Sequence, residues 1–479
     1  MDYIFKFFAM KIYICLVSFL LFSFISFGQC PTTNILITSQ AEIDNFAINY
    51  PNCTVLSHNI KIDQQNDAIT NLHGFSLITS AQHIFIVNTD IENFIGLDNL
   101  EEVSHLALWF NVKLNNFYGL SSLQNMDRLE SFLNVNLIDV SGMDSIQSIN
   151  NINFFGNTSL NNISDFSFIE VLNSLTLGGN GLNTLNGLEN LTKITEDLNI
   201  NEEPIDNLDE LANLQQIGGS LYITSNYQLQ NINALSNLET LENAYIVENT
   251  ILEDLIGLNS LHTVNEKLRI GFNHGLESLF GLINIASVED LEIYENDNLR
   301  TLKGIESLTE ITKRLLINDN PLLYNLEHIS NVSPDELDDV IMINNTSLSI
   351  CDFQLICDII EEPGVYKVIQ NNAPGCNSEE EVVLSCQDDF NDPDIDSIDS
   401  NDNLFASEFS YYPNPVSDLL TINVSEDFTY NKAIVFSLIG EKQFETSNDI
   451  IDFSSLSNGV YFVVIETVKE SRTIKIIKE

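Results

Sequence analysis

Basic side chains are scarce in this sequence. Its 479 residues include 19 lysine and arginine side chains against 69 aspartate and glutamate side chains, so the formal net charge is −50. A protein that binds nucleic acid electrostatically needs a basic surface that displaces the counterions of the phosphates. Adsorption to anionic lipid needs a basic surface as well. The charge therefore excludes nucleic acid as a partner and predicts a solvated acidic shell over an apolar interior.

Long apolar runs are absent after residue 30. Before it, Lys6 and Lys11 precede an apolar run over 12–25 and the stretch Ser26-Phe-Gly-Gln-Cys30, which predicts a signal peptide over residues 1–29. A lipid-anchored Cys30 is the rival interpretation, but such anchors need a small residue where Gln29 stands. An uncleaved anchor is disfavoured because the run is short for a bilayer span. We expect an exported chain that does not span the membrane after cleavage.

Catalytic motifs are missing too. The seven histidines are scattered along the chain, and no His-Glu-x-x-His pair occurs. The glycine-rich stretch 178–181 lacks the lysine and hydroxyl residue of a phosphate loop. The sequence therefore predicts no catalytic residue, no metal site and no cofactor.

A fixed period organises the middle of the chain. An Asn, or once a Glu, recurs at steps of 23 residues, with two steps of 24, at Asn88, Asn111, Asn134, Asn157, Asn180, Glu203, Asn226, Asn249, Asn273, Asn296 and Asn320. Such a period is typical of a solenoid. One unit cannot bury its own apolar face, but a stack of about eleven builds one continuous core.

Each repeat has three parts. In Leu268-Arg-Ile270 the alternation points both aliphatic residues to one side of a short strand. The following Asn ends the strand, and stacked asparagines are expected to form a buried ladder. Aliphatic residues then recur at every third position, which predicts a 3₁₀-like return path. Glycine at a fixed place there predicts a tight corner, with positive φ or close backbone approach, at Gly74, Gly96, Gly119, Gly142, Gly187, Gly257, Gly281 and Gly304.

The predicted fold is mainly β, a parallel β-solenoid of about eleven 23-residue coils followed by a small antiparallel β-sandwich. We expect an N-terminal cap over 30–67 with a helix at 41–50 and strands at 54–56 and 60–62. The repeats occupy 68–345, and a second cap over 346–386 has a helix at 353–360 and a strand at 365–369. The sandwich occupies 411–479, with strands at 419–424, 432–437, 460–465 and 473–477.

The acidic stretch 387–410 is interpreted as a flexible linker because it has few large apolar residues. The alternative is a calcium loop, since Asp392, Asp394 and Asp396 have its opening spacing. Ser397 and Asn403 stand where that loop needs Gly and Glu, so the linker is favoured.

Six cysteines remain after Cys15 leaves with the signal peptide, which predicts disulfides in an exported chain. They lie only at the two ends of the repeats, which about eleven coils of about 4.8 Å separate by about 50 Å. Cys30 must then pair with Cys53, and the remaining four pair among themselves in one of three ways. A zinc site is the weaker alternative because their spacing is unsuited to it. The four are Cys351, Cys357, Cys376 and Cys386.

Two family resemblances follow from these motifs. The last seventy or so residues resemble the type IX secretion sorting domain, type A, of Bacteroidetes, through Tyr412-Pro-Asn-Pro415, Gly440-Glu-Lys442, Leu456-Ser-Asn-Gly459-Val-Tyr461 and Lys475-Ile-Ile-Lys478. The resemblance implies the type IX secretion machinery as a partner, transport across the outer membrane, and removal of this domain. Its motif residues are Pro413, Asn414, Pro415, Gly459, Tyr461, Lys475 and Lys478.

The repeats resemble receptor L-domain and leucine-rich-repeat solenoids. The pattern Leu-x-Ile-x-x-Asn-x-x-Leu-x-x-Leu-x-Gly-Leu is close to that of the receptor L-domain. An aliphatic residue comes three positions after the Asn, where the usual leucine-rich repeat has it two after. This departure favours a straighter right-handed parallel β-helix over a horseshoe. The resemblance implies an architecture and says nothing about a ligand.

Outward positions of the strands supply the candidate binding residues. Trp109, Phe132 and Phe155 are expected in one column on consecutive strands. Measured from the repeat asparagines, however, Trp109 is shifted by one residue, and the sequence alone does not settle whether it belongs to the column. A row of exposed aromatics binds sugars or partner chains, and ordinary cross-strand packing is the alternative. The full candidate set is Phe85, Trp109, Phe132, Phe155, Tyr222 and Tyr245.

The predicted function is adhesion at the cell surface or outside the cell, to a glycan or a protein, without catalysis. A β-helix polysaccharide lyase or hydrolase is the alternative, and a purely structural surface protein is a third. Two or three charged residues within about 10 Å on the sheet face favour the enzyme, and a bare aromatic strip favours binding. Glu130 and Glu292 also point outward, and we interpret them as isolated, solvated carboxylates.

Overall fold

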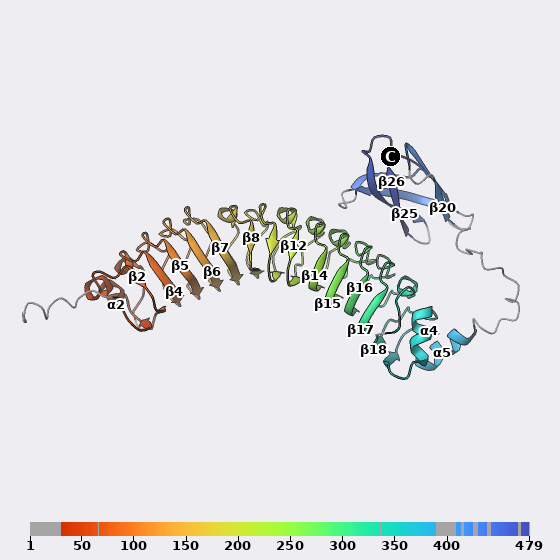
Figure 1. Cartoon of the computed structure of the whole chain (residues 1–479), viewed down its shortest axis with the longest axis horizontal. Coiled ribbons are helices and arrows are strands. Elements are labelled where there is room, and N and C mark those ends of the chain that lie inside the picture. Colours follow the sequence, from red (N-terminus) through yellow and green to blue (C-terminus); the bar gives the residue numbers. More distant parts are fainter. Residues whose placement is uncertain are drawn as a thin grey trace, which may run out of the picture. The chain divides into compact units, whose positions relative to one another are not determined.

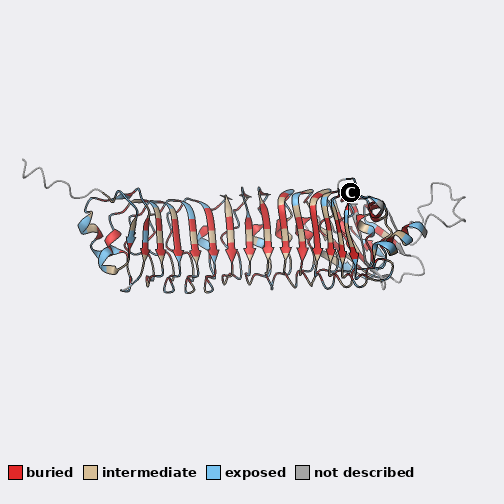
Figure 2. Ribbon diagram, turned by 90° about the horizontal axis from the view of Figure 1, so that it is seen from below, coloured by how far each residue is buried: buried red, intermediate tan, exposed pale blue. Residues whose placement is uncertain are grey.

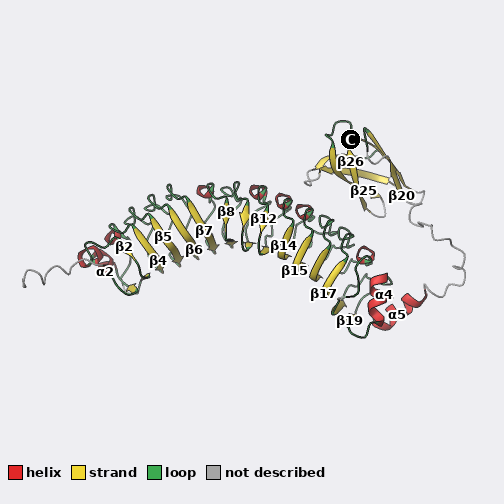
Figure 3. Cartoon of the chain, viewed as in Figure 1, coloured by secondary structure: helices red, strands yellow, loops and turns green. Residues whose placement is uncertain are grey.

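The computed structural model describes residues 30–388, apart from 66 and 336, and residues 409–478, apart from 413–415, 425–429, 438–441 and 468–470. The chain divides into two units, Met1–Ile205 and Asp206–Glu479. The predicted signal peptide and the aspartates weighed as a calcium loop lie outside the described residues. The elements are labelled in Figure 1 and coloured by type in Figure 3.

The first unit is built on a parallel sheet to which each coil adds one strand. The strand order follows the chain: β1 (Ile35–Ile37), β3 (Ile60–Asp63), β4 (Ser80–Val87), β5 (Glu102–Trp109), β6 (Asn125–Phe132), β7 (Ser148–Phe155), β9 (Ser174–Gly178) and β11 (Leu198–Asn201). Short strands accompany them, with β2 (Val55–Leu56) beside β4, and β8 (Val171–Leu172) beside β10 (Lys193–Ile194).

The second unit repeats this arrangement. Its parallel strands are, in order, β13 (Ser220–Thr224), β14 (Thr240–Val247), β15 (Thr263–Gly271), β16 (Ser287–Tyr294), β17 (Glu310–Asn318), β18 (Asp339–Ile343) and β19 (Tyr366–Gln370), with β12 (Gln216–Ile217) before them. Among these strands of each unit the pairing is parallel and one coil apart. The predicted mainly-β solenoid is confirmed.

Alternation along each strand builds the core. On β16 Leu291 and Ile293 are fully buried, and Leu268 and Ile270 occupy the same register on β15. Figure 2 shows this alternation as buried and half-buried bands along the strands. Because neighbouring coils place aliphatic residues at matching positions, each strand covers the apolar side chains of the coil before it.

The return path is formed by tight turns, as predicted. Among the described residues, six short 3₁₀ helices lie on it, η1 (His73–Phe75), η2 (Ser164–Phe166), η3 (Asp209–Leu211), η4 (Asn233–Leu235), η5 (Ile256–Leu258) and η6 (Glu327–Ile329). Gly281 has a φ of 119°, which favours glycine. Gly257 lies inside η5, where a Cβ atom would come 1.7 Å from the Ile232 carbonyl oxygen. Both predicted reasons for glycine therefore occur.

The asparagine ladder is present, with one correction. Members from Asn111 to Glu203 in the first unit, and from Asn249 to Asn320 in the second, accept a hydrogen bond from the backbone N–H one coil earlier, as Asn134 Oδ1 does from Asn111 at 2.8 Å. The amide of Asn134 also donates to the Leu108 carbonyl. In the first coil Thr89 stands in the ladder, and its N–H donates to Asn111 Oδ1. The prediction of Asn88 was wrong by one residue, because an Asn there takes the left-handed position after the strand, with a φ of 53°.

Helices and disulfides close the described ends of the coils. The predicted helix at 41–50 is two short helices, α2 (Gln40–Asp44) and α3 (Phe46–Asn49). The far end carries α4 (Gln354–Glu361) and an unpredicted helix, α5 (Glu379–Asp388). Disulfides are confirmed, and they join Cys30 to Cys53, Cys351 to Cys376, and Cys357 to Cys386. This pairing selects one of the three alternatives.

The C-terminal residues form two small antiparallel sheets. One contains β20 (Phe409–Tyr412), β21 (Leu419–Val424) and β24 (Ile450–Asp452). The other contains β23 (Lys442–Thr446), β22 (Tyr430–Ser437), β25 (Gly459–Thr467) and β26 (Ser471–Lys478). The sequence predicted β21, β22, β25 and β26 and missed the three shorter strands. Val435, Phe453 and Val463 belong to their common core.

Candidate functional site

In the first unit's sheet, strands β4, β5, β6, β7 and β9 each carry three outward side chains in register. On β7 they are Asn151, Asn153 and Phe155, while Ile152 and Phe154 point inward and are buried. The register places each of these positions beside its equivalent on the next coil. A ligand on this face would meet three parallel rows of side chains, separated by the rung spacing of about 4.8 Å along each row.

The predicted aromatic column exists and is in register. Trp109 pairs with Phe132, and Phe132 pairs with Phe155. The ring centroids are 6.2 Å and 6.4 Å apart in these two contacts. Trp109 also pairs with Val87 on the preceding strand, so Trp109 lies in the same column as Phe132 and Phe155. The apparent shift of one residue arose because Asn88, and not Thr89, was taken as the ladder residue of the first coil. Phe85 lies in the neighbouring row, with its ring 6.4 Å from that of Trp109.

A second apolar row, missed from the sequence, runs beside the first. Phe110 and Leu133 follow the last residues of β5 and β6 and have φ values of 60° and 54°. Bulky side chains rarely adopt this left-handed conformation, which costs roughly 1–2 kcal/mol. Their backbone N–H groups donate to Phe132 and Phe155 in the next coil, so the coil stacking fixes the conformation whatever the side chain. The signal in the sequence was the run of two apolar residues at the end of each strand.

Glycines make room for both rows. A Cβ atom at Gly178 would come 2.6 Å from the ring of Phe155, and one at Gly156 would come 2.6 Å from the side chain of Leu133. The two side chains therefore lie over the backbone of the following coil. We call the whole set the apolar patch. Its exposed members are Trp109 (37% exposed), Phe110 (49%), Leu133 (39%) and Phe155 (39%), and Phe132 between them is half-buried.

Polar groups border the patch on the same strands. His105 Nε2 lies 3.3 Å from Glu130 Oε2, and Arg128 Nη1 lies 3.4 Å from Glu130 Oε1. Contact with His105, more than with Arg128, lowers the pKa of Glu130 below its usual value, against the opposing effect of burial. The interpretation of Glu130 as an isolated, solvated carboxylate was wrong.

The candidates of the second unit lie in a separate group. Tyr222 and Tyr245 stack with their centroids 4.7 Å apart and an interplanar angle of 5°. The Arg269 guanidinium lies 5.6 Å from the ring of Tyr245 and 5.9 Å from that of Tyr294. Arg269 donates from Nε to Glu292 Oε2 at 2.5 Å. These tyrosines therefore flank a charged residue and do not form a bare aromatic strip.

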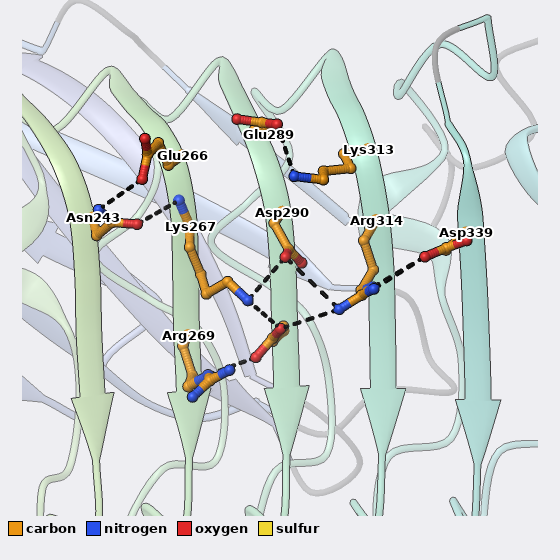
Figure 4. A network of polar contacts seen from close by, with 10 residues as sticks. Asn243, Glu266, Lys267, Arg269, Glu289, Asp290, Lys313, Arg314 and Asp339 are labelled. Atoms are coloured by element: carbon orange, nitrogen blue, oxygen red, sulfur yellow. Dashed lines mark hydrogen bonds and ion pairs between the residues drawn. The ribbon is translucent and has the colours of Figure 1, made fainter.

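A network of ion pairs continues from Arg269 across β15 to β18 (Figure 4). Lys267 Nζ contacts Asp290 Oδ2 at 2.9 Å and Glu292 Oε1 at 2.6 Å. Arg314 lies 3.8 Å from Glu292 and bonds Asp339 at 3.1 Å. Its three cations match its three carboxylates in number.

Glu292 is the centre of that network and is only 5% exposed. Burial alone would raise the pKa of Glu292, but the hydrogen bonds from Arg269 and Lys267 outweigh it and lower the pKa below its usual value. Glu292 is therefore a buried, paired carboxylate and not the isolated, solvated one expected. The pairing could not be predicted from the sequence, because the partners of Glu292 lie on the two neighbouring strands, about one coil away along the chain.

The C-terminal sheets hold the described sorting-motif residues. Gly459 and Tyr461 lie on β25, and Lys478 on β26 pairs with Gly459. Tyr461 is buried, and its hydroxyl donates to the Ser457 carbonyl at 2.8 Å. Lys475 on β26 pairs with Phe462. The remaining motif residues, Pro413, Asn414 and Pro415, lie outside the described residues.

Residues 410–479 match the secretion system C-terminal sorting domain. A sorting domain marks a protein that is secreted or held on the outer cell surface, and it makes the type IX secretion machinery a partner. No curated protein matches the chain. Within the described ranges, no helix is long and apolar enough to cross a membrane. Nor do the described residues contain a group of three or more His, Cys, Asp or Glu side chains that could hold a metal ion.

Proposed function

We propose that this exported protein is a non-catalytic binding protein that holds an extracellular ligand on the apolar patch of β5 to β7. The observation that carries the proposal is the pair Phe110 and Leu133, bulky residues that are exposed and in the left-handed conformation. Contiguous exposed apolar residues mark interaction sites in soluble proteins. Folding alone gives no reason for these residues, since Asn or Gly would fit the same backbone with less strain.

Mutual packing of the rings explains only part of the patch. Trp109 contacts Phe85 and Phe132, and such aromatic pairs contribute about 0.5–1.5 kcal/mol each. This contribution accounts for the column along β5 to β7. It does not account for Phe110, because no ring contact with Phe110 occurs among the described residues and half of its surface is open to solvent. A ligand that covers Phe110 and Leu133 supplies the missing stabilisation.

The enzyme alternative has an observation in its favour, the charged network around Glu292. Charged residues this close were the feature expected of a lyase or hydrolase. However, glycoside hydrolysis needs a carboxylic acid whose pKa is raised, so that it can donate a proton to the leaving group. Lys267 and Arg269 instead lower the pKa of Glu292. The network is better explained as charges that are paired with one another within the sheet, where loss of one partner would leave another buried charge uncompensated.

For the architecture we propose that the coils belong with receptor L-domain and leucine-rich-repeat solenoids. One strand and one tight return path per coil support this assignment. The division into a cap, repeats, a disulfide-bonded cap, a linker and a sorting domain is part of the same proposal.

The test is a binding screen with the exported protein and a matched pair of variants. The protein is applied to arrays of glycans and of extracellular proteins, and each hit is repeated with Trp109→Ser/Phe132→Ser. We expect this double variant to bind roughly tenfold more weakly or worse, because truncating a central aromatic typically costs about 2 kcal/mol or more.

The control variant is Tyr118→Ser. Tyr118 is more exposed than Trp109, at 54% against 37%, but it lies in a turn of the return path and not on the sheet face. Tyr118→Ser should bind normally. If Trp109→Ser/Phe132→Ser binds as tightly as Tyr118→Ser and the parent protein, the ligand binds elsewhere and the proposal is wrong.

A further inference from the structure

The residue that follows each of the strands β5, β6, β7, β9 and β11 takes the left-handed conformation, with φ between 53° and 70°. Coil stacking aligns these residues in one row. The backbone N–H of each of the first four donates to the last residue of the next strand, as Gly156 does to Gly178 at 2.8 Å. The row therefore begins with apolar side chains and ends with a carboxylate. Its members are Phe110, Leu133, Gly156, Gly179 and Glu202.

Two side chains of this row lean toward each other over the glycines. The Leu133 side chain lies over Gly156, where a Cβ atom would come 2.6 Å from it. From the other direction, a Cβ atom at Gly179 would come 3.4 Å from Glu202 Oε2. Gly156 and Gly179 are on adjacent coils, about 4.8 Å apart at the rung spacing of a parallel sheet. The Glu202 carboxylate therefore stands at the end of the apolar patch, next to Leu133.

A ligand can reach this end of the patch from solvent. Leu133 and Phe155 are each 39% exposed, and Glu202 is exposed as well. Within the part of the chain that the structure describes, the Glu202 carboxylate has no hydrogen-bond or ion-pair partner. The apolar surface thus ends at an open negative charge.

The cations of these coils are engaged elsewhere. The lysines and arginines of residues 102–202 are Lys113, Arg128 and Lys193. Arg128 Nη1 on β6 lies 3.4 Å from Glu130 Oε1, and Lys113 Nζ lies 3.1 Å from Asp90 Oδ2. Lys193 belongs to β10, which pairs with β8 and not with the strands of the patch. The charge at the end of the patch is therefore negative and complements a cationic ligand.

We infer that the ligand of the apolar patch is a polypeptide that lays the stem of an arginine or lysine across Leu133 and Phe155 and pairs its charged end with Glu202. This inference rests on the proposed function and names the class of its partner. Arginine and lysine have both required parts, a stem of CH₂ groups for the apolar surface and cationic donors for the carboxylate. The formal charge of −50 attracts cations to the whole surface, so it is the apolar neighbours that distinguish Glu202 from other carboxylates.

The orientation of the rings favours a polypeptide over a chain of sugars. The planes of Trp109 and Phe132 are 84° apart, and those of Phe132 and Phe155 are 33° apart. These rings form no flat platform along which successive sugar rings could lie. The separate apolar side chains of one polypeptide can contact rings of different orientation, and its arginine or lysine then fixes one end at Glu202.

The experiment selects peptides from a random library displayed on phage, with the exported protein as the immobilised target. The selected peptides should combine apolar residues with arginine or lysine. With Glu202→Lys as the target, the same library should give apolar peptides with aspartate or glutamate instead, because the charge at the end of the patch is reversed. Selection of the same basic peptides by both targets would overturn the assignment of Glu202.

A synthetic peptide from the first selection then measures the size of the effect. Glu202→Gln should weaken its binding roughly tenfold and reduce the dependence of the affinity on salt, since salt screens the ion pair that this variant lacks. Glu170→Gln is the matched control, because Glu170 is exposed in the same unit but precedes β8, away from the sheet face of the patch. It should bind like the parent protein. An unchanged salt dependence in Glu202→Gln would show that the cation pairs elsewhere.

The outcomes separate this inference from the proposed function. If the selected peptides depend on Trp109 and Phe132 but carry no arginine or lysine, the patch is a binding site and the cation assignment is wrong. If a glucosamine oligomer binds in a manner that depends on Glu202 and no peptide does, the cation belongs to an amino sugar and the polypeptide assignment is wrong. If no ligand of any class depends on the patch, both fail together.

Discussion

Replacing Glu203 by glutamine should remove a pH dependence from the stability of the first unit. Glu203 takes the place of an asparagine in the ladder and is only 1% exposed. Its Oε1 accepts from the backbone N–H and the amide of Asn180, at 3.1 Å and 2.7 Å, and its Oε2 accepts from the Leu182 N–H at 3.3 Å. Burial raises its pKa to about 7 in spite of these hydrogen bonds.

The sign and size follow from linkage. The unfolded chain has a glutamate with its ordinary pKa near 4.5, so the folded state binds the proton more tightly. The stabilisation by protonation is therefore fully present below about pH 4.5 and is lost as the pH rises through about 7. A shift of this size corresponds to about 3 kcal/mol.

The assay is urea unfolding of the parent protein and Glu203→Gln at intervals between pH 4 and pH 8.5. We expect the parent to lose stability relative to the variant by up to about 3 kcal/mol across this range. Taking the difference cancels the titration of other groups, including Asp254, whose pKa burial raises to about 6. A difference that stays constant with pH would show that Glu203 has the same pKa in the folded and unfolded states, and the account of its burial would be refuted.

Phe110→Gly should raise stability by up to about 1–2 kcal/mol in thermal or urea unfolding, because it relieves the left-handed strain, while ligand binding weakens. If it lowers stability instead, Phe110 is a packing residue. Leu291→Ala should cost about 2–5 kcal/mol in the same assay, since Leu291 is fully buried, and a cost below 1 kcal/mol would contradict the core described here. Mass spectrometry of surface-released protein should find an end near residue 410 and no peptide from 475–479; recovery of that peptide would oppose removal of the sorting domain. Deletion of 456–479 should leave folded coils in the periplasm, whereas unfolded coils would show that the repeats depend on the C-terminal sheets.

The period and alternation of the sequence were sufficient to predict the sheet, the ladder and the side of each strand that faces the core. Residues two apart on a strand point to the same side, so Leu291 and Ile293 share the side that faces the core and are both buried. Asn88 shows where this reasoning failed, because Asn suits both the ladder and the left-handed position before it. The helix α5 was missed since its first turn consists of Glu379, Glu380 and Glu381, without an apolar period.

The surface was less predictable than the core. The column of Phe132 and Phe155 followed from the period, whereas the slot of Trp109 was fixed only by the pairing of its strand with both neighbours. The pairing of Glu292 with Lys267 and Arg314 did not follow from the period, because it depends on side chains that reach across strands from 25 and 22 residues away, respectively.

The fluorescence of Trp109 tests the central claim most directly, because Trp109 is the only tryptophan of the chain and lies in the apolar patch. The ligand found in the screen is titrated into the exported protein while tryptophan emission and acrylamide quenching are recorded. The account predicts that emission shifts to shorter wavelength and that quenching falls, along one saturation curve with the same midpoint as binding. Saturated binding that leaves both the emission and the quenching of Trp109 unchanged would contradict the assignment of this face as the ligand site.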